Sequence, residues 1–491
     1  MQNAIPRVGA FARKLKLSAD AIEGGAPFDE LLDGPRTIVD ENVDGFAVGQ
    51  SVAGDERVLF VQFHFVVVAE RGCDAALRVF GRGFLERIFR DHQDFACLRQ
   101  FDRGAKSGDA CTNNEEIRVH GGDGRFPPHG TTVDMPAFRV ETANRSYDAV
   151  VERGALRKLS AAIPDSAGVV FVVTTRDVWD LHGSKLVLAL DGRPHHVLYF
   201  VGGEPNKRIA HVEEMAEQMV ELGADRSSLI VAFGGGIVTD LGGFLAAVFM
   251  RGIPLIQIPT TLLAQVDAAV GGKTGANLAG GKNLIGSFHQ PLTVLIDPDV
   301  LATLSEREYR AGLYEIIKCG IIRDRALFSI FALQRDEVLA RQPEIEERII
   351  AAAVRIKCEV VTADEREGDL RRILNFGHTV GHAIEAATKY ATLLHGEAVA
   401  YGMFAAIDLS REVAGLTSED ATEMRGVIES YGALPSLKAL NPQVLADLTL
   451  HDKKTVKGKV HFVLTPKVGE TKIVSGVAEP LVLRAIEAAI G

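Results

Sequence analysis

Cysteine is scarce in this sequence, and the five that occur, Cys73, Cys97, Cys111, Cys319 and Cys358, are scattered. No two of them form a C-x-x-C pair. Such spacing argues against a disulfide framework and against a structural zinc site, and it fits a reducing compartment. We therefore predict a cytoplasmic protein whose chemistry does not depend on cysteine.

Positive charge is also in deficit, because 54 Lys and Arg stand against 65 Asp and Glu, for a net charge of -11. The chain has no basic field for nucleic acid, so an anionic ligand would need a local basic pocket. No charged start followed by a long apolar run marks a secretory signal. The apolar stretch 229–250 contains a triple glycine and Asp240, which favours a buried strand, turn and helix over a membrane span. We expect neither nucleic acid nor a membrane as a partner.

Residues 1–134 differ from the rest of the chain. They contain no tyrosine or tryptophan but half of the 24 phenylalanines, and no periodic pattern is sustained. This stretch is either a small extra domain or a non-native extension that arises from a start site placed too far upstream, with Met135 as the real start. We favour the second interpretation, since consistent patterning begins only after Met135.

Strands and helices alternate from residue 136 onward, which indicates an α/β fold with a parallel sheet. An amphipathic helix is predicted at 208–223, and long helical segments begin near 300–305, where Ser305 and Glu308 form a capping box. We place domains at 135–303 and 304–491, and a β-hairpin at 458–477. The predicted strands are 168–175, 195–203, 229–236, 253–261 and 292–298.

Two loops follow predicted strands and contain groups suited to a dinucleotide. Glycines 234–236 precede the helix that contains Asp240, and a turn without side chains lets the backbone approach a pyrophosphate. A tight turn with no ligand explains this triple glycine equally well. The second loop, 202–207, adds Glu204 and Lys207 at the same edge of the sheet, which favours the dinucleotide interpretation.

Lysines stand among glycines in the segment 259–288. Asp267 follows two threonines at the end of a strand, and Lys273, Lys282 and Asn283 come later in the glycine-rich surroundings. Lysines concentrated in this way in an acidic protein predict an anion pocket. The alternative is that they are ordinary solvated loop lysines.

Three histidines, together with Glu315 among apolar residues, suggest a metal site. His378 and His382 share one helical face, and His395 follows one connection later. Together with a distant glutamate they would suit zinc with three or four protein ligands. Glu315 and Lys318 could instead be a surface ion pair, and the histidines could be ordinary core or surface residues.

Taken together, these motifs resemble the 3-dehydroquinate synthase family. The resemblance covers residues 136–491 without interruption and does not extend to 1–134. The motifs that carry it are "GGEPNK", "FGGGIVTDLGGFLAAVFMRG", "PTTLLAQVDAAVGGKTGANLAGGKNLIGSF", "EIIK", "ADEREGDLRRILNFGHTVGHAIEA", "HGEAVAYGM" and "HDKKTVKGKVHFVL".

This resemblance implies a Rossmann-like dinucleotide-binding domain followed by a mainly α-helical metal- and substrate-binding domain. It implies a lyase that converts 3-deoxy-D-arabino-heptulosonate 7-phosphate to 3-dehydroquinate and phosphate, with catalytic NAD and a divalent metal, zinc or cobalt. It also implies a homodimer in which Arg251 reaches the neighbouring subunit's site.

Roles for individual residues follow from the same resemblance. The metal ligands would be Glu315, His378 and His395. The catalytic residues would be Lys273, Lys318, Asn375 and His382. The substrate would contact Arg251, Lys273, Lys282, Asn283, Lys357, Arg371, Asn375, His382 and one lysine of the pair Lys453 and Lys454, of which we choose Lys454. The residues expected to bind NAD are Glu204, Lys207, Gly235, Gly236, Asp240, Thr260, Thr261, Asp267, Lys282 and Thr303.

One departure from the family pattern concerns the adenosine end of NAD. The first strand ends "VVTTRDVW", whereas the family more usually has an acid directly after "VVT" as the partner of the adenosine ribose. Asp177 is a candidate substitute.

Three alternative functions remain open at this stage. Another sugar-phosphate cyclase of the same fold would act on a substrate without a carboxylate, and would not need both Arg371 and Lys357. A metal-dependent polyol dehydrogenase would release NADH and would not need a lysine-rich phosphate pocket. A non-catalytic NAD-binding module would not need the metal and substrate residues.

Overall fold

The computed structural model describes residues 5–9, 16–19, 137–143, 145–450 and 460–491. The chain divides into two compact units, Met1–Pro128 and His129–Gly491. In the first unit, β1 (Ile5–Gly9) and β2 (Lys16–Ala19) pair as antiparallel strands. The rest of the predicted extension, with Met135, lies outside the described residues.

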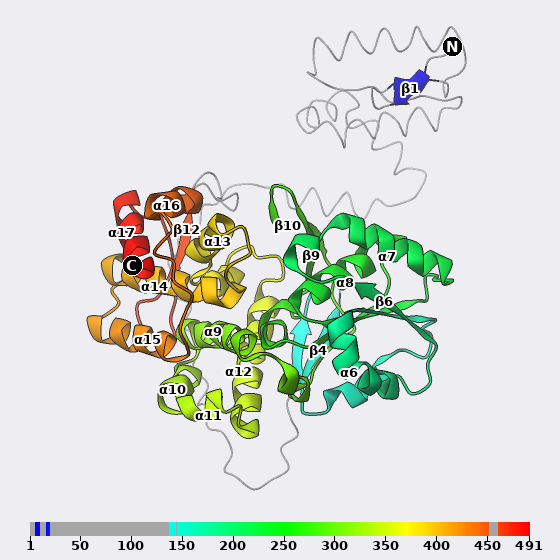
Figure 1. The fold of residues 1–491 in the computed structure, drawn as a ribbon, viewed down its shortest axis with the longest axis horizontal. Helices are drawn as coiled ribbons and strands as arrows, with labels where there is room; N and C mark the ends of the chain where they lie inside the picture. Colours follow the sequence, from blue (N-terminus) through cyan, green and yellow to red (C-terminus); the bar gives the residue numbers. More distant parts are fainter. Residues whose placement is uncertain (1–4, 10–15, 20–136, 144, 451–459) are drawn as a thin grey trace, which may run out of the picture. The chain divides into compact units, whose positions relative to one another are not determined.

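A seven-stranded sheet organises the first part of the second unit (Figure 1). The strand order is β3-β4-β11-β8-β7-β5-β6, and every pair is parallel except the antiparallel edge pair β3 and β4. The predicted α/β class with a parallel sheet is therefore confirmed. The strands are β3 (Ala137–Glu141), β4 (Ser146–Val151), β5 (Val170–Thr175), β6 (His195–Phe200), β7 (Leu229–Gly234), β8 (Leu255–Pro259) and β11 (Thr293–Ile296).

Alternate side chains of the central strands enter two separate cores. Phe171 and Val173 of β5 pack with α7 (Ile209–Glu221) and α8 (Gly236–Val248), whereas Val170 and Val172 pack with α6 (Arg176–Ala189). Strands covered on both faces need apolar residues at every position, which explains their continuous apolar runs. This arrangement leaves the carboxyl ends of the strands to form the site.

Helices dominate after residue 305, as the sequence predicts. Ser305 begins the first of them, and its hydroxyl accepts a hydrogen bond from the Glu308 N–H at 3.3 Å. The predicted C-terminal hairpin is present as β12 (His461–Leu464) and β13 (Lys472–Ser475). The helices are α9 (Glu306–Arg323), α10 (Arg325–Leu333), α11 (Arg335–Leu339), α12 (Pro343–Ala363), α13 (His378–Ala387), α14 (His395–Val413), α15 (Ser418–Ser430), α16 (Pro442–Leu450) and α17 (Glu479–Ile490).

The segment 259–288 holds two features that sequence patterning did not predict. The first is a π-helical turn, η5 (Ala264–Ala268). The second is an antiparallel hairpin of β9 (Lys273–Leu278) and β10 (Gly281–Phe288). A Cβ atom on Gly286 would overlap the Thr274 carbonyl oxygen, so a glycine is needed here where the strands approach closely.

The apolar stretch 229–250 forms β7 and α8, as expected from its triple glycine. Within the described part of the chain, no helix has both the length and the apolar character needed to span a bilayer.

Candidate active site

The two predicted dinucleotide loops meet the β9–β10 hairpin at the carboxyl edge of the sheet. Lys207 forms an ion pair with Asp240 of α8 and donates a hydrogen bond to Asn283 Oδ1 at 2.7 Å. Asn277 of β9 donates to Glu204 Oε1 at 2.7 Å. Residues far apart in sequence therefore build one edge, where ligands bind in open α/β sheets.

The glycine-rich turn leaves little room for side chains. A Cβ on Gly235 would lie 3.0 Å from Thr261 Cγ2, and one on Gly236 would lie 3.3 Å from the Ala268 Cβ. The nearby Thr260 N–H donates to the Gly234 carbonyl at 2.9 Å, which fixes the turn. The unpaired N–H groups at the start of α8 suit a pyrophosphate.

Lys282 connects the dinucleotide loop to the helical half of the unit. Its Nζ lies 3.0 Å from Glu385 Oε1 and 3.7 Å from Glu204 Oε2. It also lies 5.0 Å from the ring centroid of Tyr390. Burial lowers the pKa of Lys282, but Glu385 and Glu204 outweigh this effect and raise it overall, so the side chain is charged.

Three helices bring the predicted metal ligands together. Glu315 Oε1 lies 3.8 Å from His378 Nε2 and 4.0 Å from His395 Nε2. The nearest ligand atoms of the three residues all lie within 4.8 Å of one another. Ligands about 2.0–2.2 Å from a tetrahedral zinc lie only about 3.3 Å apart, so small side-chain adjustments would complete the site.

The chemistry of Glu315 and His378 fits a divalent metal. Glu315 is 1% exposed, and its Oε1 has no hydrogen-bond partner among the described residues. Burial, followed by the charges of Lys318, His395 and His382, holds the pKa of His378 well below its usual range. A buried carboxylate oxygen without a donor and a neutral imidazole are the forms in which these groups bind metal.

Glu385 contacts the candidate site, although no role was predicted for it from the sequence. Its Oε2 lies 3.1 Å from His395 Nδ1, and its Oε1 accepts from Lys282. Burial alone would raise the pKa of Glu385, but His395 and Lys282 outweigh it and hold this pKa well below its usual range. A carboxylate that accepts the Nδ1 proton leaves Nε2 free to bind metal.

A second possible ligand group shares His395 with the first. His382, Glu385 and His395 also have ligand atoms within 4.8 Å of one another. The ring centroid of His382 lies 5.3 Å from that of His378 and 6.0 Å from that of His395. His382 and Glu385 are three residues apart on α13, and this spacing alone could have predicted that they lie on the same face of the helix.

A buried ion pair and a partly buried one lie beside these residues. Lys318 Nζ donates to Glu315 Oε2 at 2.5 Å, and Lys357 of α12 pairs with Asp267 of the π turn. Burial would raise the pKa of Asp267, but Lys357 and Lys318 outweigh it and lower this pKa. The prediction that Glu315 and Lys318 are more than a surface pair is supported by their burial, since each is 1% exposed.

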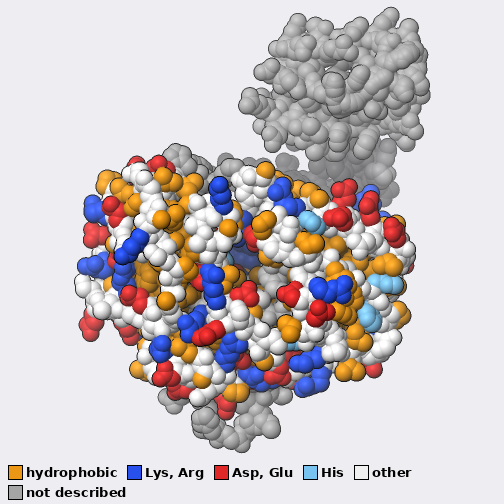
Figure 2. Space-filling model, viewed as in Figure 1, with side chains coloured by type: hydrophobic (Ala, Val, Ile, Leu, Met, Phe, Trp, Pro, Cys, Tyr) orange, Lys and Arg blue, Asp and Glu red, His pale blue; other side chains and the backbone are white. Residues whose placement is uncertain are grey.

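The predicted substrate residues near α13 have partners within the protein. Lys273 pairs with Glu367, which also accepts a hydrogen bond from Asn375 Nδ2 at 3.0 Å. Arg371 is buried and donates to the Glu365 carbonyl at 2.5 Å and to the Gly271 carbonyl at 3.2 Å. Figure 2 shows Lys and Arg side chains around a hollow near the middle of the described surface. Glu367 was missed because nothing in its local pattern distinguishes it from a surface acid.

Some predicted residues lie apart from this cluster. Thr303 Oγ1 lies 2.8 Å from His182 Nε2 of α6. Arg251 is exposed and has a left-handed backbone, with φ 70°. Lys453 and Lys454 lie outside the described residues. Their roles stay predictions.

The sequence that forms this site matches a known protein family. Residues 197–311 match the family model for the N-terminal part of 3-dehydroquinate synthase, and residues 312–455 match that for its C-terminal part. The chain belongs to the 3-dehydroquinate synthase family. A 3-dehydroquinate synthase from Solibacter usitatus is 59% identical over 356 residues, which cover 72% of this chain and 100% of the relative.

Two solved structures of related cyclases have a fold similar to that of this chain. A 2-deoxy-scyllo-inosose synthase in complex with carbaglucose-6-phosphate, NAD⁺ and Co²⁺ is 26% identical, with a TM-score of 0.65. It covers 72% of this chain and 100% of its own. A 2-epi-5-epi-valiolone synthase from Streptomyces hygroscopicus with NAD⁺ and Zn²⁺ bound is 29% identical, with a TM-score of 0.66. The shared coverage is 72% of this chain and 99% of that one.

Proposed function

We propose that this chain is a 3-dehydroquinate synthase that converts 3-deoxy-D-arabino-heptulosonate 7-phosphate to 3-dehydroquinate and phosphate, with NAD and zinc or cobalt as cofactors. The observation that carries the proposal is the cluster of Glu315, His378 and His395 beside lysines of the β9–β10 hairpin. The 59% identity to a named 3-dehydroquinate synthase and the cofactors in the related cyclases support it.

Each cofactor has residues that fit it. Glu315, His378 and His395 would hold the metal, and the turn at Gly235 and Gly236 would receive the pyrophosphate of NAD. When bound, the metal polarises substrate oxygens as a Lewis acid, and NAD accepts and later returns a hydride. Three protein ligands leave positions open for substrate oxygens.

The remaining side chains bind and orient the substrate. Lys273, Lys282 and Arg371 bring positive charge to a site in an acidic protein, which suits a substrate with a phosphate and a carboxylate. Their present partners, Glu367, Glu385 and two carbonyl groups, preserve their positions until the anion arrives. Lys318 keeps the charge of the buried Glu315 balanced.

We also propose that the chain is a homodimer in which Arg251 reaches the partner's site. The exposure of Arg251 and of neighbouring Met250 supports this, because arginine and methionine are enriched in protein interfaces.

The function can be tested directly with purified protein, the heptulosonate phosphate, NAD and Zn²⁺ or Co²⁺. We expect stoichiometric release of phosphate with no net rise in absorbance at 340 nm, since the hydride is returned in each cycle. Steady NADH production from a polyol without phosphate release would instead support the dehydrogenase alternative.

A cyclase acting on another sugar phosphate is the nearest alternative. It is disfavoured because the solved cyclases with other names are only 26% and 29% identical to this chain. Assays with sedoheptulose 7-phosphate and glucose 6-phosphate distinguish the two, and turnover of either in preference to the heptulosonate would overturn our assignment.

Lys273 should impose an alkaline limit on activity. Desolvation and the charge of Arg371 lower the pKa of Lys273 to about 8, against the opposing effect of its ion pair with Glu367. Its positive charge is therefore lost as the pH rises through about 8, and attraction for the substrate anion weakens above that pH. We expect kcat/KM to fall on that side in a pH–rate profile. Lys273→Arg should shift the fall to higher pH because a guanidinium stays protonated; an unchanged profile would assign the limit to another group.

A further inference from the structure

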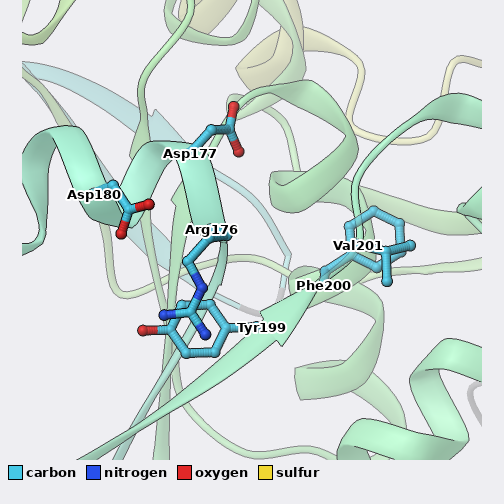
Figure 3. A pocket seen from close by; sticks show the side chains of 6 residues that line it. All are labelled: Arg176, Asp177, Asp180, Tyr199, Phe200 and Val201. Carbon is cyan, nitrogen blue, oxygen red and sulfur yellow. The ribbon is translucent and has the colours of Figure 1, made fainter.

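A pocket of about 470 Å³ opens at the carboxyl ends of β5 and β6 (Figure 3). Arg176 and Asp177 enter it from the first turn of α6, and Asp180 follows one turn later. The lining is completed by Tyr199, Phe200 and Val201 at the end of β6.

Arg176 presents its charge without an acidic partner. Its guanidinium carbon lies 3.6 Å from the centroid of the Tyr199 ring, and it makes no ion pair with any described residue. Figure 3 shows the Asp177 carboxylate turned away from this stack. The charge of Asp177 instead contributes, after burial, to raising the pKa of Glu308 on α9. Arg176 is therefore a cation held on an aromatic face and still able to bind an anion.

The sheet brings the carboxyl end of β5, which Arg176 follows, next to that of β7, which the glycine-rich turn follows. Strand β5 is the direct neighbour of β7, and Val173 pairs with Ala232. Arg176 directly follows β5, and Gly235 directly follows β7. In Rossmann folds, an acid further along the chain from the glycine-rich turn binds the 2′-hydroxyl of NAD, and an arginine nearby can accommodate the 2′-phosphate of NADP. Here β5 ends at Thr175 and α6 begins at Arg176, so the nearest acid is Asp177, one residue further along.

We propose that Arg176, stacked on Tyr199, is a subsite for the adenosine 2′-phosphate, so that this chain binds NADP(H) as well as NAD(H). The proposal rests on the function above, because it assumes a dinucleotide on the glycine-rich turn. A phosphate on the guanidinium gains a charge-assisted hydrogen bond that a bare ribose does not. Asp177 and Asp180 oppose this attraction, so we expect the two cofactors to bind with similar affinity, not NADP(H) alone.

The test is a fluorescence titration of the full chain with NADH and with NADPH. In the wild type, we expect the two Kd values to agree within about tenfold. In Arg176→Glu, the ratio of the NADPH Kd to the NADH Kd should rise by about ten- to a hundredfold, as expected for loss of a charge-assisted hydrogen bond. The matched control is Arg226→Glu, the same charge change on an exposed arginine just before β7, at the opposite end of that strand. It should leave the ratio unchanged.

Two results would count against the proposal in different ways. If the ratio is the same in Arg176→Glu and in the wild type, Arg176 does not read the 2′-position and the inference is wrong. If the wild type binds neither cofactor, the proposed function itself fails. Thermal unfolding of each variant shows whether it has folded, and Arg176→Gln provides a second, less perturbing variant that should raise the ratio in the same direction.

Discussion

Replacing His395 with alanine is expected to abolish tight metal binding and to lower kcat by at least about a thousandfold, because the metal contributes several kcal/mol of transition-state stabilisation. His395 has two links to the centre. Its Nε2 lies 4.0 Å from Glu315 Oε1, and its Nδ1 lies 3.1 Å from Glu385. Zinc content by mass spectrometry and titration with Co²⁺ would measure the loss.

His382→Ala is the matched comparison on the same face of α13. We expect this variant to keep its metal but lose turnover, since we assign His382 to the substrate and not to the metal. If it loses the metal while His378→Ala retains it, the ion is held by the second group, His382, Glu385 and His395. The pair of variants therefore decides between the two ligand sets.

Replacing Gly396 with alanine is expected to cost about 3 kcal/mol of folding free energy or more, at the upper end of the usual range for overpacking a core. A Cβ at this position would overlap the carbonyl oxygen of Ala311, one helical turn before Glu315. Because backbone lies on both sides of the contact, α14 and α9 would have to separate, and His395 would move from Glu315. We expect a lower midpoint in urea unfolding and weaker zinc binding.

Gly426→Ala is the control for the glycine change itself. Gly426 lies on the exposed face of α15, and no atom would meet a Cβ there within 4 Å. Alanine in an open helix position should stabilise the protein by about 0.5–1 kcal/mol. If Gly396→Ala is as stable as the wild type, the close approach of the two helices does not set the metal centre.

The sequence predicts the central strands well because each is buried on both faces. Residues 229–236 and 253–261 are short apolar runs ended by small or polar residues, and they appear as β7 and β8. Strands β3 and β4, at one side of the sheet, and the hairpin β9–β10 are not predicted. In the hairpin, glycines and lysines replace the residues that favour strands, and close backbone approach holds the pair together.

The candidate site shows a similar limit. The i, i+4 spacing of His378 and His382 indicates one helical face, but it cannot say which histidine meets Glu315. The family resemblance supplied that choice, and it stays a prediction. The role of Glu385 depends on contact with Lys282, which is 103 residues away in the sequence. Contacts of that kind leave no local pattern, so only the structure reveals them.

The π turn at Ala264–Ala268 fixes the length of the chain beside the metal centre. A π turn contains one residue more than an α turn, and this extra residue sets the direction of Asp267 towards Lys357. Removing a single residue would restore an α turn and rotate Asp267 by about 100° around the axis. Lys357 would then be left buried with no counter-charge from this segment. An insertion or deletion in this turn would therefore move the charge of Asp267 away from Lys357. The same change in an exposed connection would be tolerated.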